Sequence, residues 1–460
     1  MINFIKQNKI IVIIIITYFL IFATYSGLRH YTFQTQTWDM AVFEQSFWNT
    51  TQGKLMWNNF EGKNHFAIHF SPFLLLLVPL YAVWPSPYNL LIIQTSALAV
   101  AALPLYLLAK KILDKKWAII ITCLYFLYPS LHWVNLFDFH EVSFAIPLIL
   151  TIFYFLEKKR FLWSSVFLIL AASVSENMIM AVFFIGLYVL ILKNRKYGSI
   201  VTILSFIYFI LVSTIIMPAL DGGIVRLDRY SQFGQTVPEI ITNAILKPSL
   251  TLQTIFTSAK MFYLLKIFLP VAFLPLIAWQ TLILLVPGLI QNLLTNYESQ
   301  FINFYQYDSI LIPFIFIGVI FGLKKILAKE KASRKIILPT ITLLTLIGFL
   351  WNSPLSHFNF PLAKFTHERI EPFKQIVTMI PDDASVAAYT NLVPHLTHRD
   401  HIYMAGHEPF LVDYAIINSE DIFDFPNEES LNQYLKIYQE TNQYEILSID
   451  DKYFILKRNE

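Results

Sequence analysis

Long apolar runs are the feature that most constrains what this chain can fold into. A membrane-spanning helix needs about 20 mainly apolar residues, and runs of that kind recur from Ile10 to Trp351. Hydrophobic residues make up 56% of the chain and charged residues only 14%. A water-soluble domain of that composition would expose large apolar patches. The sequence therefore predicts an all-α polytopic membrane bundle.

Net charge and cysteine content exclude several other classes. The formal net charge of +3 over 460 residues is too small to indicate nucleic acid or another polyanion as a partner. The only cysteine, Cys123, lies within an apolar run, so neither a disulfide framework nor a thiolate metal site can form. Membrane lipid is the partner that the composition indicates.

Clusters of basic residues predict the topology. Lys and Arg beside spans concentrate on the cytoplasmic side of a membrane, so the loops between the clusters face outward. The N-terminus is then cytoplasmic, and everything after Asn352 lies outside the plasma membrane. The clusters are Lys6 and Lys9, Lys110 to Lys116, Lys158 to Arg160, Lys193 to Lys196, and Lys324 to Lys335.

One region decides the number of spans in residues 1–352. Two apolar stretches, Pro72 to Trp84 and Tyr88 to Leu108, are separated by a Pro-Ser-Pro break. Two crossings here would place the Lys110 cluster outside. We therefore predict that the short first stretch is an interfacial or re-entrant helix and that the second one crosses. The total is then about eleven spans.

The composition becomes that of a soluble segment from Pro354 onward. Alternating helical and strand-like patterns predict a small extracytoplasmic α/β domain over residues 353–460, roughly 100 residues in size. The predicted helices are Glu368 to Met379 and Glu428 to Gln439, and the predicted strands are Ala384 to Tyr389, His401 to Ala405, Val412 to Ile417, Tyr444 to Ile449 and Tyr453 to Lys457.

The long first outer loop, residues 29–71, contains the first candidate site. Trp38, Val42, Phe43 and Phe47 fall on one helical face, and Asp39 opens that helix. An amphipathic helix lying on the outer membrane surface would hold Asp39 at the boundary of water and lipid. The alternative is that Asp39 only caps the helix, as acidic residues at helix starts commonly do.

Two histidines near the end of this loop form a second candidate. His65 and His69 are spaced i, i+4, so they share a helical face and could bind a phosphate or a metal. Two histidines alone make an incomplete metal site. The alternative interpretation is a pair of interfacial histidines with satisfied hydrogen bonds.

The second and fourth outer loops supply further ionisable residues. Asp138, His140 and Glu141 gather within four residues at a membrane boundary, a pattern that indicates a site, although short loops between spans are polar by necessity. Arg226 and Arg229 in the fourth loop could bind an anion. Glu176 lies at the outer end of its span. The C-terminal histidines, which lack the spacing of a metal motif, are interpreted as structural: His395, His398, His401 and His407.

Several segments bring a known family into view. The run from Asp39 through Asn49, the His69 to Pro72 segment and Pro79-Leu80-Tyr81 resemble a predicted membrane protein family catalogued as domain of unknown function 2079. At the soluble end, Ala384 to Ala388 and Asn391 to Arg399 match the same family. The resemblance covers nearly the whole chain.

More distantly, the layout resembles the GT-C glycosyltransferases of the mannosyl- and aminoarabinosyl-transferase type. The resemblance implies that Asp39 is the catalytic base and that Asp138 is the acidic residue of the second outer loop. In that superfamily a Lys-Pro-Pro motif at the end of the first loop meets the lipid phosphate. Here His69-Phe70-Ser71-Pro72 stands in its place, with histidine where the pattern has lysine.

The resemblance implies a membrane enzyme that transfers a hexosyl or pentosyl group from a polyprenyl-phosphate sugar donor to a glycan, lipid or protein acceptor. Asp39 would deprotonate the acceptor hydroxyl. His69 and His65, with Arg226 or Arg229, would stabilise the departing phosphate. A divalent cation at Asp138, His140 and Glu141 is the only cofactor considered, and the same three residues could instead orient substrate.

Two other functional classes stay open at the sequence level. A transporter or flippase of lipid-linked or polymeric substrates would place ionisable residues near mid-membrane, where Lys266 is the clearest example. A non-catalytic membrane scaffold would need neither a site nor a path. An enzyme requires Asp39, His69 and the Asp138 loop to meet at one outer site.

Overall fold

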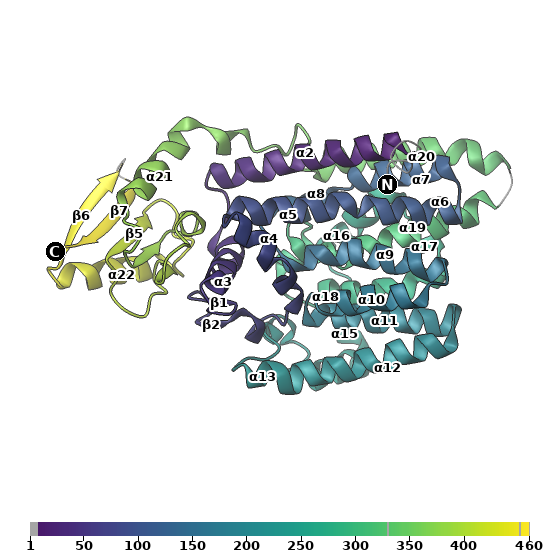
Figure 1. Ribbon diagram of the computed structural model, residues 1–460, viewed down its shortest axis with the longest axis horizontal. Coiled ribbons are helices and arrows are strands. Elements are labelled where there is room, and N and C mark those ends of the chain that lie inside the picture. Colours follow the sequence, from purple (N-terminus) through teal and green to yellow (C-terminus); the bar gives the residue numbers. More distant parts are fainter. Residues whose placement is uncertain (1–7, 329–330, 450–451, 460) are drawn as a thin grey trace.

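The fold separates a bundle of long helices from a small sheet at one end. The computed structural model describes residues 8–328, 331–449 and 452–459, so Lys6 of the first basic cluster lies outside the described residues. The longest helices run side by side along the long axis of the molecule (Figure 1). The elements of the first outer loop lie between this bundle and the C-terminal sheet.

Capping residues set where several bundle helices begin. Asp114, the N-cap of α7, accepts a hydrogen bond from Trp117 N, and Asn194 does the same for Tyr197 N at α12. The bundle helices are α2 (Lys9–Tyr31), α5 (Pro87–Val100), α6 (Ala102–Ile112), α7 (Lys115–Phe126), α8 (Pro129–Leu136), α9 (Ala145–Glu157), α10 (Phe161–Ala172), α11 (Glu176–Leu192), α12 (Arg195–Leu211), α13 (Met217–Ala219), α14 (Val237–Leu246), α15 (Pro248–Ile255), α16 (Ser258–Phe268), α17 (Leu274–Ile277), α18 (Leu282–Leu293), α19 (Leu311–Leu327) and α20 (Lys331–Asn352).

Four segments among the described residues are long and apolar enough to cross a membrane, or six if each bent helix pair counts as one span. The continuous pair α5 and α6, Pro87–Ile112, is one of the four. Pro72 to Trp84 forms only two short pieces, η3 (Pro72–Leu76) and α4 (Val78–Val83), which are too short to cross. The figure of about eleven spans stays a prediction.

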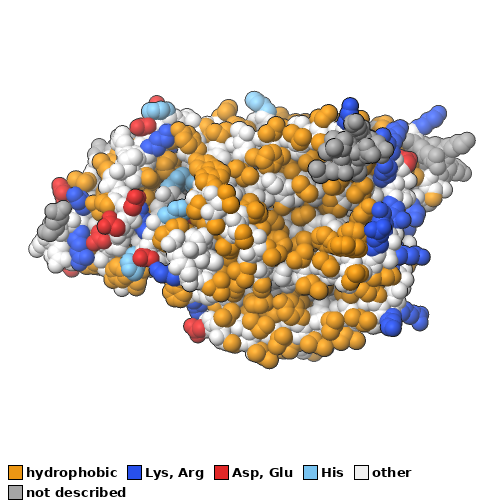
Figure 2. Space-filling view, in the orientation of Figure 1, with side chains coloured by type: hydrophobic (Ala, Val, Ile, Leu, Met, Phe, Trp, Pro, Cys, Tyr) orange, Lys and Arg blue, Asp and Glu red, His pale blue; other side chains and the backbone are white. Residues whose placement is uncertain are grey.

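Charge is distributed unevenly along the molecule. Figure 2 shows a dense group of Lys and Arg side chains at the end away from the sheet, and most Asp and Glu at the sheet end. A broad hydrophobic surface lies between them. This arrangement is the one that the positive-inside rule leads us to expect for a spanning bundle. The assignment of each end to a side of the membrane stays a prediction.

The C-terminal segment forms a five-stranded mixed sheet with the strand order β4-β3-β5-β7-β6. β3 pairs in parallel with β4 and β5, and β7 pairs antiparallel with β5 and β6. The predicted elements are confirmed, and the domain boundary at 352/353 stays a prediction. The elements are α21 (His367–Met379), α22 (Glu428–Glu440), β3 (Val386–Ala388), β4 (Ile402–Met404), β5 (Tyr414–Asn418), β6 (Tyr444–Ile449) and β7 (Tyr453–Arg458).

The first outer loop packs against both the bundle and the sheet. Phe33 stacks on Phe373 of α21 with ring centroids 4.9 Å apart, and the Thr37 hydroxyl donates to the Thr390 carbonyl at 3.2 Å. The loop contains η1 (Thr37–Ala41), α3 (Val42–Thr51), β1 (Trp57–Asn58), β2 (Lys63–Asn64) and η2 (His65–Ala67). The loop is therefore held between the two halves of the molecule.

The predicted amphipathic surface helix is wrong. The helical segment starts after Gln36, and Asp39 lies inside its first turn, a π turn, without capping it. In α3 the polar Glu44 and Gln45 are as deeply buried as Val42 and Phe47. The C-terminal segment covers the face that sequence periodicity assigned to water, because Gln45 donates to the Arg399 carbonyl at 3.2 Å.

Candidate functional site

An acid–histidine pair joins the first and second outer loops. Asp39 Oδ1 lies 2.7 Å from His140 Nε2. The Asp39 side chain keeps 21% of its surface exposed, and that of His140 keeps 5%. Burial alone would lower the pKa of His140, but Asp39 and the neighbouring carboxylates outweigh burial and raise it. The contact with His140 therefore orients the Asp39 carboxyl group, which still reaches solvent.

A buried amide of the bundle positions the second loop. Gln94 of α5 donates from Nε2 to the Asp138 carbonyl at 2.7 Å, and its Oε1 accepts from His140 N at 2.8 Å. Asp138 itself has a left-handed backbone, with φ of 45°. The signal for Gln94 was an amide within an apolar run, because such a group must find partners inside the protein.

Asp138 connects this loop to the first one. Its Oδ2 accepts from Gln36 N at 2.9 Å. Burial raises the pKa of Asp138 to about 6, with Asp39 acting in the same direction and Arg29 opposing both. The carboxylate therefore fixes the backbone three residues before Asp39.

His69 is held by a carboxylate of the bundle. Its Nδ1 lies 3.0 Å from Glu176 Oε1, and Phe70 N donates to Glu176 Oε2 at 3.1 Å. Burial opposes protonation, but Glu176 dominates and raises the pKa of His69 to about 9. The side chain of His69 is 34% exposed. It is therefore a cation at neutral pH with a free edge.

The predicted sharing of one ligand by His65 and His69 does not fit the observed contacts. His65 Nδ1 lies 3.0 Å from Glu61 Oε2, whereas His69 uses Glu176. Their ring centroids are 5.9 Å apart. The turn between them is fixed by Gly222, where a Cβ would lie 1.9 Å from the Ala67 carbonyl oxygen.

The three candidate metal ligands interact with different partners. Asp138 accepts from Gln36 and His140 contacts Asp39, while Glu141 acts electrostatically on His69. Within residues 8–328, 331–449 and 452–459, no group of three or more His, Cys, Asp or Glu is arranged to hold a metal ion. We therefore derive no step from a divalent cation.

Of the two predicted arginines, Arg229 packs among aromatic side chains. Its guanidinium lies 4.0 Å from the Tyr297 ring centroid, and it donates to the Tyr307 hydroxyl at 3.2 Å. Burial raises the pKa of Tyr307 to about 12, and both Arg229 and Asp39 act on that hydroxyl, in opposite directions. Arg226 is exposed at the start of the same short helix.

Aromatic side chains line the space between these charges. Phe137 stacks on His140 with centroids 5.4 Å apart and meets Tyr305 edge-on at 4.5 Å. Tyr305 and Tyr307 lie in the loop before α19, with centroids 6.3 Å apart. Sequence analysis missed both tyrosines because nothing in their local pattern separates them from other interfacial aromatic residues.

An apolar cavity of about 520 Å³ opens between α16 and α18. Its lining includes Met261, Phe268 and Leu293. The Arg229 loop packs beside this end of α18, where Tyr230 donates to the Gln291 carbonyl at 2.9 Å. The loop that carries Arg229 thus packs against α18, a helix that lines the cavity.

A second acid–histidine pair lies one helical turn beyond the first. Glu44 Oε1 lies 2.8 Å from His398 Nε2 and accepts from the Tyr81 hydroxyl at 2.6 Å. Glu44 is fully buried, and burial raises the pKa of its carboxyl group. Trp48 stacks on His398. No local pattern connects Glu44 with a histidine 354 residues away.

Comparisons with known proteins agree on the general kind of molecule. A family model described as "Predicted membrane protein (DUF2079)" matches residues 29–454. The fold resembles ArnT from Cupriavidus metallidurans in the apo state, with a TM-score of 0.56, 9% identity and 98% of each chain covered. For ArnT from the same organism bound to undecaprenyl phosphate, the TM-score is 0.52 and the identity is 8%. That match covers 96% of this chain and 97% of the ArnT chain. No curated protein matches.

Proposed function

Because the chain belongs to the DUF2079 family of predicted membrane proteins and has the fold of ArnT, a GT-C glycosyltransferase, we propose that it is a membrane glycosyltransferase. It transfers a hexosyl or pentosyl group from a polyprenyl-phosphate sugar to an acceptor at the outer face of the plasma membrane. The observation that carries the proposal is the 2.7 Å contact between Asp39 and His140, which joins the first and second outer loops.

Asp39 is the proposed general base. The acceptor hydroxyl oxygen attacks the anomeric carbon while its proton passes to the Asp39 carboxylate. The bond between the anomeric carbon and the phosphate oxygen breaks in the same step. His140 orients Asp39, and the exposed part of the carboxyl group is where the acceptor hydroxyl binds.

The leaving group is a polyprenyl phosphate, which departs as a stable anion without being protonated. Arg229 and the protonated His69 are the proposed partners of this phosphate. Support comes from Tyr307, which accepts a hydrogen bond from Arg229 and responds electrostatically to Asp39. His65 is assigned a supporting role, because its contact with Glu61 orients the turn before His69.

The proposed place for the polyprenyl chain is the apolar cavity between α16 and α18. An isoprenoid tail requires an apolar groove that opens toward lipid, with a cation at its outer end. The cavity has this arrangement because Leu293 lies at the same end of α18 as Gln291, which contacts the Arg229 loop. The fold neighbour bound to undecaprenyl phosphate is consistent with a lipid of this class.

A transporter is the second class considered, and the contacts favour it less. Transport requires ionisable groups along a path through the bundle. Lys266, the clearest charge in the apolar core, donates to the Ile302 carbonyl at 3.3 Å. Asp39 and His69 lie instead in the first outer loop, and Asp138 and His140 lie in the second.

A panel of polyprenyl-phosphate sugars tests the proposal. Membranes containing the chain should consume at least one donor and release free polyprenyl phosphate, and Asp39→Asn should abolish that release without loss of protein. The matched control is Asp383→Asn, which changes an exposed carboxylate outside the site. Transfer retained by Asp39→Asn would contradict the assignment of the base, and no consumption of any donor would contradict the function.

A further inference from the structure

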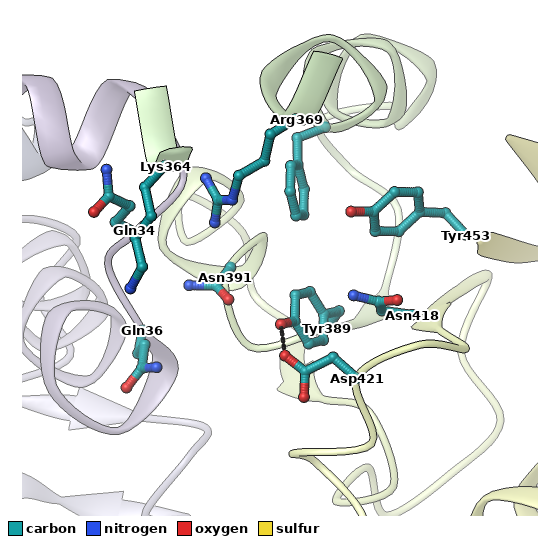
Figure 3. A pocket seen from close by; sticks show the side chains of 10 residues that line it. Gln34, Gln36, Lys364, Arg369, Tyr389, Asn391, Asn418, Asp421 and Tyr453 are labelled. Atoms are coloured by element: carbon teal, nitrogen blue, oxygen red, sulfur yellow. Dashed lines mark hydrogen bonds between the residues drawn. The ribbon is translucent and has the colours of Figure 1, made fainter. Parts of the chain in front are cut away.

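A second cavity lies on the other side of the Asp39 segment, between the first outer loop and the C-terminal sheet (Figure 3). Its volume is about 310 Å³, at the lower end of the range of about 300–1,000 Å³ for small-molecule sites. Gln36 and Lys364 lie on one side and Asp421 on the other, with Arg369 and Asn391 between them.

The cavity has an excess of positive charge. Lys364 and Arg369 line it, and Asp421 is the one carboxylate among its lining residues. Burial lowers the pKa of Lys364, and the neighbouring guanidiniums of Arg29 and Arg369 lower it further. In the part of the chain that the structure describes, neither Lys364 nor Arg369 forms a salt bridge.

The single carboxylate in the wall is already engaged. Asp421 accepts hydrogen bonds from the Tyr389 hydroxyl and from Phe423 N. Both contacts hold it on the sheet side of the cavity. Neither of these contacts uses Lys364 or Arg369, so both side chains are left to meet a ligand.

Arg369 is fixed in place and still has donors to spare. Its guanidinium donates to the Thr32 carbonyl and, at 3.0 Å, to the Phe33 carbonyl. A guanidinium has five N–H donors, so three remain. Lys364 adds an ammonium group and Asn391 an amide, whose Nδ2 already donates to the Thr35 carbonyl at 3.1 Å. Several fixed donors around a cationic centre match a tetrahedral oxyanion.

Gln36 connects this cavity to the proposed base. Its side chain lines the cavity, and its backbone N–H donates to Asp138 at 2.9 Å. Asp39 follows three residues later in the same short segment. The cavity therefore borders the segment that leads into Asp39.

We propose that this cavity binds a phosphate group of the acceptor and thereby brings the acceptor hydroxyl to Asp39. The inference rests on the proposed glycosyl transfer, because it assigns the acceptor side of that reaction. The phosphate can belong to a soluble phosphorylated glycan or to a lipid headgroup. Lys364 and Arg369 are the residues that select it.

Direct binding of phosphate tests the inference without any sugar donor. The full chain in phosphatidylcholine nanodiscs is titrated with inorganic phosphate and with glycerol 1-phosphate by calorimetry. Lys364→Gln should weaken binding about tenfold, the effect of losing one charged hydrogen bond. Arg369→Lys, which keeps the charge but loses the paired N–H donors of the guanidinium, should weaken phosphate binding as well. Equal binding by wild type and both variants would overturn the inference.

Controls separate this site from the rest of the molecule. Lys436→Gln removes an exposed lysine of α22 that pairs with Glu440 and should bind phosphate as wild type does. Asp39→Asn should also bind phosphate normally while losing transfer. If Asp39→Asn loses transfer but Lys364→Gln binds normally, only the acceptor site is wrong. If Lys364→Gln no longer binds phosphate and no donor is consumed, only the proposed transferase activity is wrong.

The lipid composition of the nanodiscs distinguishes a lipid headgroup from a soluble acceptor as the source of the phosphate. If a lipid headgroup fills the cavity, added phosphatidylglycerol should raise the apparent Kd for glycerol 1-phosphate in wild type and not in Lys364→Gln. If the acceptor is soluble, phosphatidylglycerol should leave that Kd unchanged. Each result supports phosphate recognition, provided that the Lys364 variant has lost it.

Discussion

Two acid–histidine pairs start from the same short segment of the first outer loop, and they differ in nearly every respect that matters for chemistry. Asp39 pairs with His140 of the second outer loop, and 21% of the Asp39 side-chain surface is exposed. Glu44 pairs with His398 of the C-terminal segment, and none of its side-chain surface is exposed. A base must reach its substrate, so only the first pair can act on an acceptor.

The second pair joins two parts of the molecule. Glu44 receives the Tyr81 hydroxyl as well as His398, so α3, α4 and the C-terminal segment meet at one buried carboxyl group. Removing one partner of a buried charge is costly, because the remaining group loses hydrogen bonds that water cannot replace. We therefore propose that the Asp39 pair determines the rate of transfer and that the Glu44 pair determines the stability of the fold.

Replacing each of the two histidines in turn gives the largest expected contrast in kcat. His140→Gln should lower kcat about 100-fold, within the range of a general-base contribution, because Asp39 loses its oriented cation. His398→Gln should change kcat less than about threefold, since His398 does not contact Asp39. The measurement is donor consumption at saturating donor. A large loss in both variants, or in neither, would break the distinction.

His69 should produce a smaller effect that depends on pH. Its pKa is raised from 6.5 to about 9, so its charge is present at pH 7 to 8 and is lost as pH rises through about 9. Wild-type kcat should therefore fall above about pH 9. His69→Gln should be slower by about tenfold at pH 8 and should lack that alkaline fall. An unchanged pH profile would remove His69 from the phosphate site.

Tyr81→Phe should give the smallest change, and in stability alone. Tyr81 is fully buried and its hydroxyl donates to Glu44 at 2.6 Å. Removing the hydroxyl should lower the free energy of unfolding by about 1 kcal/mol and leave kcat unchanged. Thermal unfolding in detergent measures the first quantity and donor consumption the second. A loss of kcat at full stability would place Tyr81 in the reaction.

Much of the architecture follows from periodicity. The residues of the C-terminal helices and strands alternate in ways that only one kind of element satisfies, so α21, α22 and β3 to β7 match the predicted segments closely. The alternation of basic clusters predicts that the short Pro72 to Trp84 stretch does not cross the membrane. This stretch forms two short helical pieces. The predicted family is confirmed, and the fold resembles that of ArnT.

Sequence patterns pointed to several residues of the candidate site, but they did not predict which of those residues contact each other. Asp39, His140 and Asp138 each stood out as ionisable groups at a membrane boundary, and the structure brings them together. The contact of Glu44 with His398 could not be read, because amphipathic patterns do not record which surface a distant segment will cover. Lys364 and Arg369 were missed for the same reason, since their cavity exists only after the sheet docks on the first loop.

The most direct test of the central claim is the release of polyprenyl phosphate by the purified chain from the donor that its membranes consume. Wild type should release it together with the glycosylated acceptor, and Asp39→Asn should release essentially none while it unfolds at the same temperature as wild type. Release by Asp39→Asn at the wild-type rate would contradict the claim that the Asp39–His140 pair is the catalytic centre.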